Sequence, residues 1–187
     1  MSRWEPDAAG RLTKAATALF AEQGYDETTV AQIAEAAGLT KRTFFRYFAD
    51  KREVLFDGSH EFRGRWLRGI DAAPASAAPM EAVAGAFDEV ARLFEDRHSF
   101  ARVRAQIISG HPELQERELI KLQLLSADVA AALAARGLSP NAATLAAQTA
   151  VTVFHVAFAR WVSQDDPVAL RRLIDESLSE LRSVTTA

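Results

Sequence analysis

The sequence predicts an all-α protein of about nine helices. Apolar residues recur three and four positions apart along most of the chain, which is the spacing of one helix face. No stretch alternates apolar and polar residues as a half-buried strand would. Prolines 79, 112, 140 and 167 each open an amphipathic segment, and proline suits a first helical turn because its missing N–H has no partner there.

Composition excludes several classes of protein. The 187 residues are 49% apolar and 25% charged, with a net charge of −3, which is ordinary for a soluble globular chain. The absence of cysteine excludes disulfides, thiolate metal sites and a cysteine nucleophile, and it suits a reducing interior. The first ten residues are polar and lack the apolar core of a secretion signal, so we expect a cytoplasmic protein.

One segment has the length of a membrane span. Residues 142–159 are apolar, but alanine dominates them and Gln148, Thr149, Thr152 and His155 interrupt them. We therefore expect a buried or interface helix here, and no membrane partner.

The first fifty residues predict three short helices. Leu12 to Phe20 follow helical spacing up to Gly24, and a second helix ends at Gly38. Thr29 with Gln32 resembles a capping box for the second helix, and Thr40 caps a third that extends to about Tyr47. Two short helices joined by "AGLT" have the helix–turn–helix arrangement, so we expect residues 1–50 to form a helix-turn-helix DNA-binding domain.

The third helix is basic and aromatic, which leaves two interpretations. Such a pattern is often only a solvated helix face over a core. In a helix–turn–helix, however, the first turn of the second helix reaches base edges in the major groove. Residues 40–43 occupy that turn, and Phe44 and Phe48 share a face suited to packing on the first two helices.

The segment "RLTKAATALFAEQGYDETTVAQIAEAAGLTKRTFFRYFADKREVLF" closely resembles the amino-terminal domain of the TetR family of bacterial transcriptional regulators. The resemblance implies a homodimer that binds a palindromic DNA operator and represses transcription until a small molecule releases it. It also implies phosphate contacts from Thr29 and Lys51, base contacts from Thr40, Lys41, Arg42 and Thr43, and positions near the DNA backbone for Arg46 and Tyr47.

The chain departs from the family pattern at two aromatic positions. Phe45 stands where the family usually has tyrosine, and Tyr47 where it often has histidine. Phe45 cannot donate to a phosphate, so that contact is lost or passes to the Tyr47 hydroxyl. Arg63, Arg65 and Arg68 either extend the phosphate-binding surface or are simply solvated.

The remaining chain, 51–187, predicts a ligand-binding and dimerisation domain made of a helical bundle. A helix over 51–70 is expected to link the two domains, and the small-residue segment 71–79 breaks it. Five helices follow, and the family's usual dimer interface corresponds to residues 140–163 and 167–183.

Two sets of residues are candidates for a ligand pocket. The stripe with Phe87 and Phe94 is either core or pocket wall. Gln148, Thr149, Thr152 and His155 share one face, and either satisfy one another or supply the few polar groups of an apolar pocket. The run "QIISGHPELQERELIKL" is similar to acyl-CoA-like ligand-binding domains of actinobacterial regulators, including the mycofactocin-associated one. That similarity implies an acyl-CoA effector, with Arg104 near the CoA phosphates.

Two other classes of function are weighed against this one. No HExxH motif, glycine-rich phosphate loop or G-x-S-x-G elbow is present, so a metal-free helical enzyme has no residue set to support it. A helical interaction module with an acidic protein partner is the other alternative. We expect no enzyme activity, no metal and no cofactor.

Overall fold

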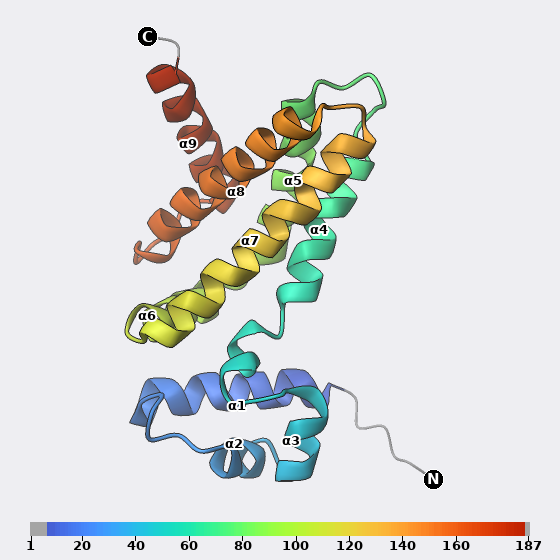
Figure 1. Cartoon of the computed structure of the whole chain (residues 1–187). Coiled ribbons are helices and arrows are strands. Elements are labelled where there is room, and N and C mark those ends of the chain that lie inside the picture. The colour runs from blue at the N-terminus through green and yellow to red at the C-terminus, as the bar shows by residue number, and fades with distance from the viewer. Residues whose placement is uncertain (1–6, 186–187) are drawn as a thin grey trace. The chain divides into compact units, whose positions relative to one another are not determined.

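The computed structural model describes residues 7–185 (Figure 1). Within them the chain forms nine α-helices and one 3-10 helix and no strand, which confirms the all-α prediction. The helices are α1 (Ala8–Gln23), α2 (Val30–Ala36), α3 (Lys41–Tyr47), the 3-10 helix η1 (Arg52–Phe56), α4 (Ser59–Asp71), α5 (Pro79–Phe94), α6 (His98–Ser109), α7 (Pro112–Ala135), α8 (Pro140–Val162) and α9 (Leu170–Thr185).

The described residues divide into two compact units. The first, here called the N-terminal unit, takes in the chain up to Ser59 together with Val103–Leu114. The second, here called the bundle unit, consists of His60–Arg102 and the chain from Gln115 onward. This division differs from the predicted boundary after residue 50, because Val54, Leu55 and Phe56 are buried in the core of the N-terminal unit. The sequence also did not anticipate that Ile107, Ile108 and Leu114 belong to that core.

The expected helix over 51–70 is two helices in the structure. Asp50 is the reason for the separate start of η1, since its Oδ1 accepts from the backbone N–H of Arg52 at 2.8 Å and of Glu53 at 3.1 Å. The Arg52 guanidinium also lies 2.7 Å from Asp50 Oδ2, and this hydrogen bond lowers the pKa of the Asp50 carboxyl. The α-helix α4 begins only at Ser59.

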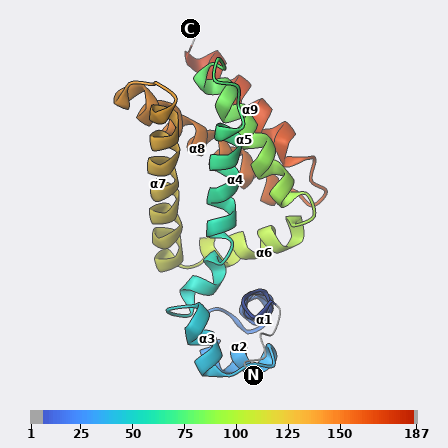
Figure 2. The same ribbon diagram turned by 90° about the vertical axis from the view of Figure 1, so that its right-hand side faces the viewer.

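In the N-terminal unit, α1 lies across α2 and α3 (Figure 2). The predicted caps are present: Thr29 forms a capping box with Gln32, and the Thr40 hydroxyl accepts from the backbone N–H of Thr43. Gly38 follows α2 at φ 66°, a conformation that favours glycine. Buried apolar residues from all three helices close the core: Leu12, Ala16, Phe20, Ile33, Phe44 and Phe48.

In the bundle unit, α4 lies between α7 on one side and α5 with α9 on the other (Figure 2). Its core is rich in rings: Trp66 of α4 lies 5.5 Å from Phe87 of α5 and 5.9 Å from Phe154 of α8, between ring centroids. Helix α8 is long and apolar enough to cross a membrane by length and composition alone, a test that core helices of soluble proteins also pass. Here it packs along α9 and contributes eight buried residues.

The predicted starts of α8 and α9 differ in outcome. The Ser139 hydroxyl accepts from the backbone N–H of Ala142, as expected for an N-cap before Pro140. Helix α9, in contrast, begins at Leu170 rather than at Pro167. The Trp161 indole N–H donates to the Val168 carbonyl at 3.1 Å, which holds the intervening segment in a non-helical turn.

Helices α4 and α5 cross at a contact between glycines. A Cβ atom on Gly69 would lie 2.4 Å from Ala86 Cα and 2.5 Å from the Gly85 carbonyl oxygen. Both neighbours are backbone atoms and have no rotamer to change. Only glycine therefore permits this approach, which places Trp66 one turn away against Phe87.

Gly69→Ala is expected to lower the free energy of unfolding by about 1–3 kcal/mol through overpacking at this crossing. Gly58→Ala is the matched control, because a Cβ there meets no atom within 4 Å. Thermal and urea denaturation of the two variants measure the difference. Equal midpoints for both would contradict the close crossing.

Candidate nucleic-acid interface and ligand site

Helix α3 has two faces of opposite character. Phe44 is fully buried and Phe48 nearly so, with ring centroids 5.4 Å apart. Lys41, Arg42 and Arg46 are exposed on the other side of the helix. The rings therefore anchor α3 to its unit, and the cations face solvent.

The first turn of α3 is ordered by two threonines. Thr40 accepts from the Thr43 backbone N–H at 3.1 Å, and the two hydroxyl oxygens lie 3.0 Å apart. This cap fixes the direction in which Lys41 and Arg42 leave the backbone. A short polar turn followed by cations is the composition required for reaching base edges in a groove.

Two aromatic residues near the end of α3 are exposed. Phe45 has 56% of its surface accessible and packs edge-on against Phe44. The Tyr47 hydroxyl accepts from the Arg46 guanidinium at 3.2 Å, and that guanidinium lies over the Tyr47 ring. Arg46 and Tyr47 thus form a pair at the surface.

Thr29 and Lys51 are the two predicted phosphate contacts. They differ in exposure and in the contacts that their side chains make within the protein. Thr29 is exposed at the N-terminus of α2. Lys51 is half-buried, and its Nζ donates to the Tyr25 carbonyl at 2.6 Å and to the Asp26 carbonyl at 3.4 Å while lying over the Tyr25 ring. Because an ammonium has three donors, one remains for a ligand.

Tyr25 is a structural residue that the sequence did not single out. Its ring packs on Phe20 and on His111, at centroid distances of 5.1 and 4.8 Å. Burial, with a smaller contribution from the negative charge of Glu113, raises the pKa of Tyr25 to about 12. The hydroxyl is therefore neutral at physiological pH, and the Lys51 ammonium lies over a neutral ring.

Arg11 is a second structural residue that the sequence analysis did not single out. Its guanidinium donates to the Ala37 carbonyl at the end of α2, where a cation interacts favourably with the helix dipole. It thereby ties α1 to the turn before α3. The sequence does not reveal either role, because Tyr25 packs on His111 and Arg11 donates to Ala37, and both partners are distant along the chain.

Arg104, predicted near a CoA phosphate, lies in the N-terminal unit. Its Nε donates to the Leu55 carbonyl at 2.7 Å, and its guanidinium carbon lies 5.0 Å from the centre of the Phe56 ring. These contacts fasten η1 within the unit. Arg104 therefore belongs to a different compact unit from the other candidate pocket residues, all of which belong to the bundle unit.

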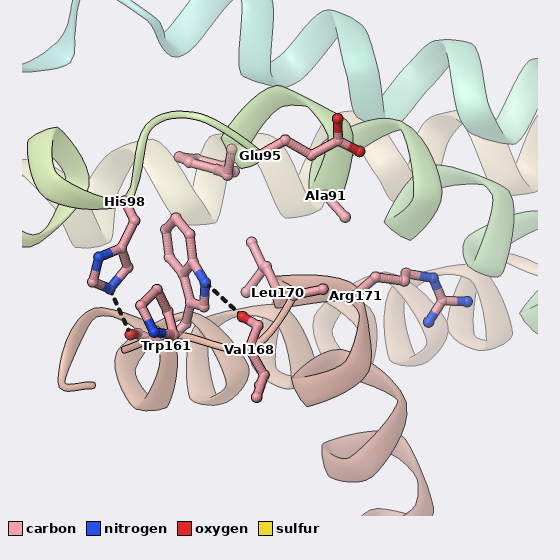
Figure 3. Close-up of a pocket in the computed structure, with 10 residues that line it drawn as sticks. Ala91, Glu95, His98, Trp161, Val168, Leu170 and Arg171 are labelled. Carbon is pink, nitrogen blue, oxygen red and sulfur yellow. Dashed lines mark hydrogen bonds between the residues drawn. The ribbon is translucent and has the colours of Figure 1, made fainter. Parts of the chain in front are cut away.

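The bundle unit contains a cavity of about 180 Å³. Figure 3 shows the Trp161 indole between the end of α5 above and the start of α9 below, with His98 beside it. His98 Nε2 lies 3.0 Å from the Trp161 carbonyl oxygen, so this nitrogen carries the proton. The lining residues are Ala91, Phe94, Glu95, His98, Trp161 and Pro167–Arg171.

The candidate pocket residues of the bundle unit fall in different places. Phe94 lines the cavity, and Phe87 is fully buried in the core. Gln148, Thr152 and His155 are exposed on the outer face of α8, and Thr149 is half-buried. None of the four polar residues lines the cavity that Phe94 lines.

The interior of the bundle unit contains few polar side-chain atoms among the described residues. Trp66 Nε1 and Arg65 Nε are buried side-chain atoms without a hydrogen-bond partner among the described residues. Arg65 otherwise pairs with Glu89 and Glu61, and Arg63 pairs with Asp128 of α7 at 2.5 Å. Across residues 7–185 no group of three potential metal ligands occurs.

Family comparisons agree with the two-part organisation. Residues 12–57 match the family of bacterial regulatory proteins of TetR type, and residues 77–186 match the MftR C-terminal domain. The chain belongs to the TetR family. Its bundle is an MftR-type C-terminal domain, and the fold is that of a TetR-family regulator.

Curated TetR-family relatives match over part of their length. The chain is 42% identical over 80 residues to the transcriptional regulator TcmR of Streptomyces glaucescens, which is 43% of this chain and 35% of that protein. It is 34% identical over 108 residues to the repressor KstR2 of Mycobacterium tuberculosis, covering 57% of this chain and 50% of that one. The chain thus spans about half or less of the length of these relatives.

Solved TetR-type structures share the fold over nearly the whole chain. FadR of Bacillus subtilis in complex with stearoyl-CoA has a TM-score of 0.66 at 23% identity, covering 92% of this chain and 96% of that one. FadR of Thermus thermophilus in complex with lauroyl-CoA has a TM-score of 0.59 at 21% identity, covering 92% of each chain.

In this TetR-family chain, Lys51→Met is expected to lower the free energy of unfolding by about 1–2 kcal/mol, because the Tyr25 and Asp26 carbonyls lose a charged donor and the Tyr25 ring loses a cation. Lys41→Met, at an exposed position, is expected to change it by less than about 0.5 kcal/mol. Urea denaturation followed by circular dichroism compares the two. If both variants matched the wild type, the Lys51 contacts would have no structural role.

Proposed function

We propose that the protein is a cytoplasmic, homodimeric repressor that binds a palindromic DNA operator and is released by a small hydrophobic or acyl-CoA-like ligand. The observation that carries the proposal is the division of α3, with Phe44 buried beneath it and Lys41, Arg42 and Arg46 exposed above a capped first turn.

Each exposed group of α3 has a chemical role in DNA recognition. Arg42 and Lys41 suit the O6 and N7 acceptors of guanine in the major groove, and Thr40 and Thr43 supply short hydroxyls beside them. The Arg46–Tyr47 pair and Thr29 suit phosphate oxygens, together with the remaining donor of Lys51. Phe45 replaces a hydrogen-bonding residue with an apolar ring, which suits a thymine methyl or a sugar.

The aromatic interior of the bundle supports a hydrophobic effector. Phe94 lines the cavity, and its ring also contacts Phe154, which in turn contacts Trp66 in the core. The two FadR neighbours were solved with acyl-CoA bound. A pocket for a drug-sized ligand needs about 300–1,000 Å³. Since the cavity is smaller, ligand binding must favour a more open bundle.

Release of DNA then follows as a population shift. The ligand favours the open bundle, and DNA favours the state in which the two recognition helices of the dimer match the groove spacing. Because coupling is reciprocal, DNA must weaken ligand binding by the same factor as ligand weakens DNA binding. The chain passes between the two units three times, at residues 59–60, 102–103 and 114–115, which provides covalent routes for that coupling.

The outer face of α8, together with α9, is the proposed dimer interface. Leu145 and Val156 are 65% and 44% exposed, which is high for large apolar side chains on a helix. Gln148, Thr152 and His155 lie on the same face. Their position favours hydrogen bonds across a symmetric dimer, where each patch meets its own copy, over a role in the interior pocket.

Lys41→Ala and Arg42→Ala are expected to weaken operator binding, and loss of a bidentate arginine–guanine contact costs about 1–3 kcal/mol. Fluorescence anisotropy measures this with the DNA upstream of the protein's own gene, or with a duplex selected from random sequences. Arg172→Ala, which removes an equal charge from α9, is expected to bind like the wild type. Equal binding to operator and scrambled duplex would contradict the proposal.

Leu145→Glu is expected to shift the protein toward monomer, because two carboxylates would be buried opposite each other in the interface. Leu119→Glu on α7 is the matched control, since Leu119 is 62% exposed. Sedimentation velocity distinguishes the two. A Leu145→Glu variant that stays dimeric would place the interface elsewhere.

A further inference from the structure

The two described tryptophans differ in one respect. The Trp161 indole N–H donates to the Val168 carbonyl at 3.1 Å. Trp66 has no accessible surface, and its indole nitrogen has no hydrogen-bond partner among the described residues. A buried N–H without an acceptor is unfavourable, since it has lost water and gained nothing in return. The Trp66 indole N–H is therefore a buried donor that is available to an acceptor.

The surroundings of Trp66 do not explain this donor. Its ring contacts are Phe62, Phe87 and Phe154, all in edge-on geometry, and none carries an oxygen or nitrogen. The face of a phenyl ring is only a weak acceptor. A buried water needs two to four polar partners, which these rings do not offer.

Arg65 Nε, the other buried unpartnered atom, is a different case. Its guanidinium is already neutralised by Glu89 and Glu61 through its two terminal nitrogens. The Trp66 side chain, in contrast, has no other polar atom that could pair with a neighbour. Its N–H is the only polar atom of the side chain.

Trp66 is also connected to the cavity through aromatic rings. The Phe154 ring centroid lies 5.9 Å from that of Trp66 and 6.2 Å from that of Phe94, and Phe94 and Trp161 both line the cavity. The ring contacts that connect Phe94 of the cavity wall with Trp66 are apolar. Aromatic rings in edge contact can separate without breaking a hydrogen bond.

We propose that Trp66 is the polar anchor of the ligand site, and that the effector carries a hydrogen-bond acceptor within its hydrophobic part. A keto, ester or ether oxygen fits this description. A plain saturated chain would leave the indole unpaired, and an ammonium group would oppose its N–H with another donor. The inference rests on the proposed ligand-binding role of the bundle and adds a specificity to it.

The test uses two small probes of matched shape, acetophenone and ethylbenzene, which differ in a carbonyl against a methylene group. Indole ¹H–¹⁵N correlation spectra of the full-length protein follow binding, and the signal missing from Trp66→Phe identifies Trp66. Trp161→Phe is the matched control, because it removes an indole donor that is already bonded. Circular dichroism checks that both variants are folded.

Acetophenone is expected to move the Trp66 signal downfield, whereas ethylbenzene leaves it at the position of a free N–H. The ratio of the two affinities is expected to fall about five- to tenfold in Trp66→Phe and to stay unchanged in Trp161→Phe. If Trp66→Phe fails to fold, the signals missing from Trp4→Phe and Trp161→Phe leave the Trp66 signal by elimination, and the wild-type spectra then decide between the two outcomes.

An equal ratio in wild type and Trp66→Phe would overturn the proposal, as would the absence of any Trp66 shift with acetophenone. Release of operator DNA by acyl-CoA is measured separately. A protein that responds to acetophenone at Trp66 but is not released by acyl-CoA would contradict only the proposed effector class.

Discussion

Burial of the Phe44 ring beneath α3 is the constraint on which the N-terminal unit depends. A helix of seven residues is too short to be stable alone, so its position comes from packing. Phe44 and Phe48 provide that packing, and the Thr40 cap and the Arg11 contact with Ala37 fix the turn that precedes it. The exposed cations are then presented in one orientation, which sequence-specific binding requires.

The bundle unit differs from the N-terminal unit because its core contains, among many aliphatic side chains, a connected group of aromatic rings. Close approach of α4 and α5 at Gly69 places Trp66 against Phe87, and the ring cluster continues through Phe154 to Phe94. The edge contacts of Trp66 leave its indole N–H without an acceptor among the described residues, whereas the Trp161 indole N–H donates to the Val168 carbonyl. Such a core is stable when closed and also suits an apolar guest, which a regulator that must exchange two states needs.

Much of this organisation could be predicted from the sequence, since it is encoded in local patterns. The caps at Thr29, Thr40 and Ser139 and the all-helical fold need only neighbouring residues. The contribution of residues 103–114 to the N-terminal unit could not be predicted, because it depends on contacts such as Arg104 with Leu55, forty-nine positions apart. Similarly, the outward position of Gln148, Thr152 and His155 depends on which face of α8 packs inward, and both faces of that alanine-rich helix resemble a core.

Hydroxyl-radical footprinting of the bound operator tests the central claim most directly, namely that two copies of α3 read DNA as a symmetric pair. The account predicts two protected regions related by two-fold symmetry, with centres about one helical turn or a multiple of it apart on the duplex. Protection without symmetry, or spread evenly along any duplex, would contradict it.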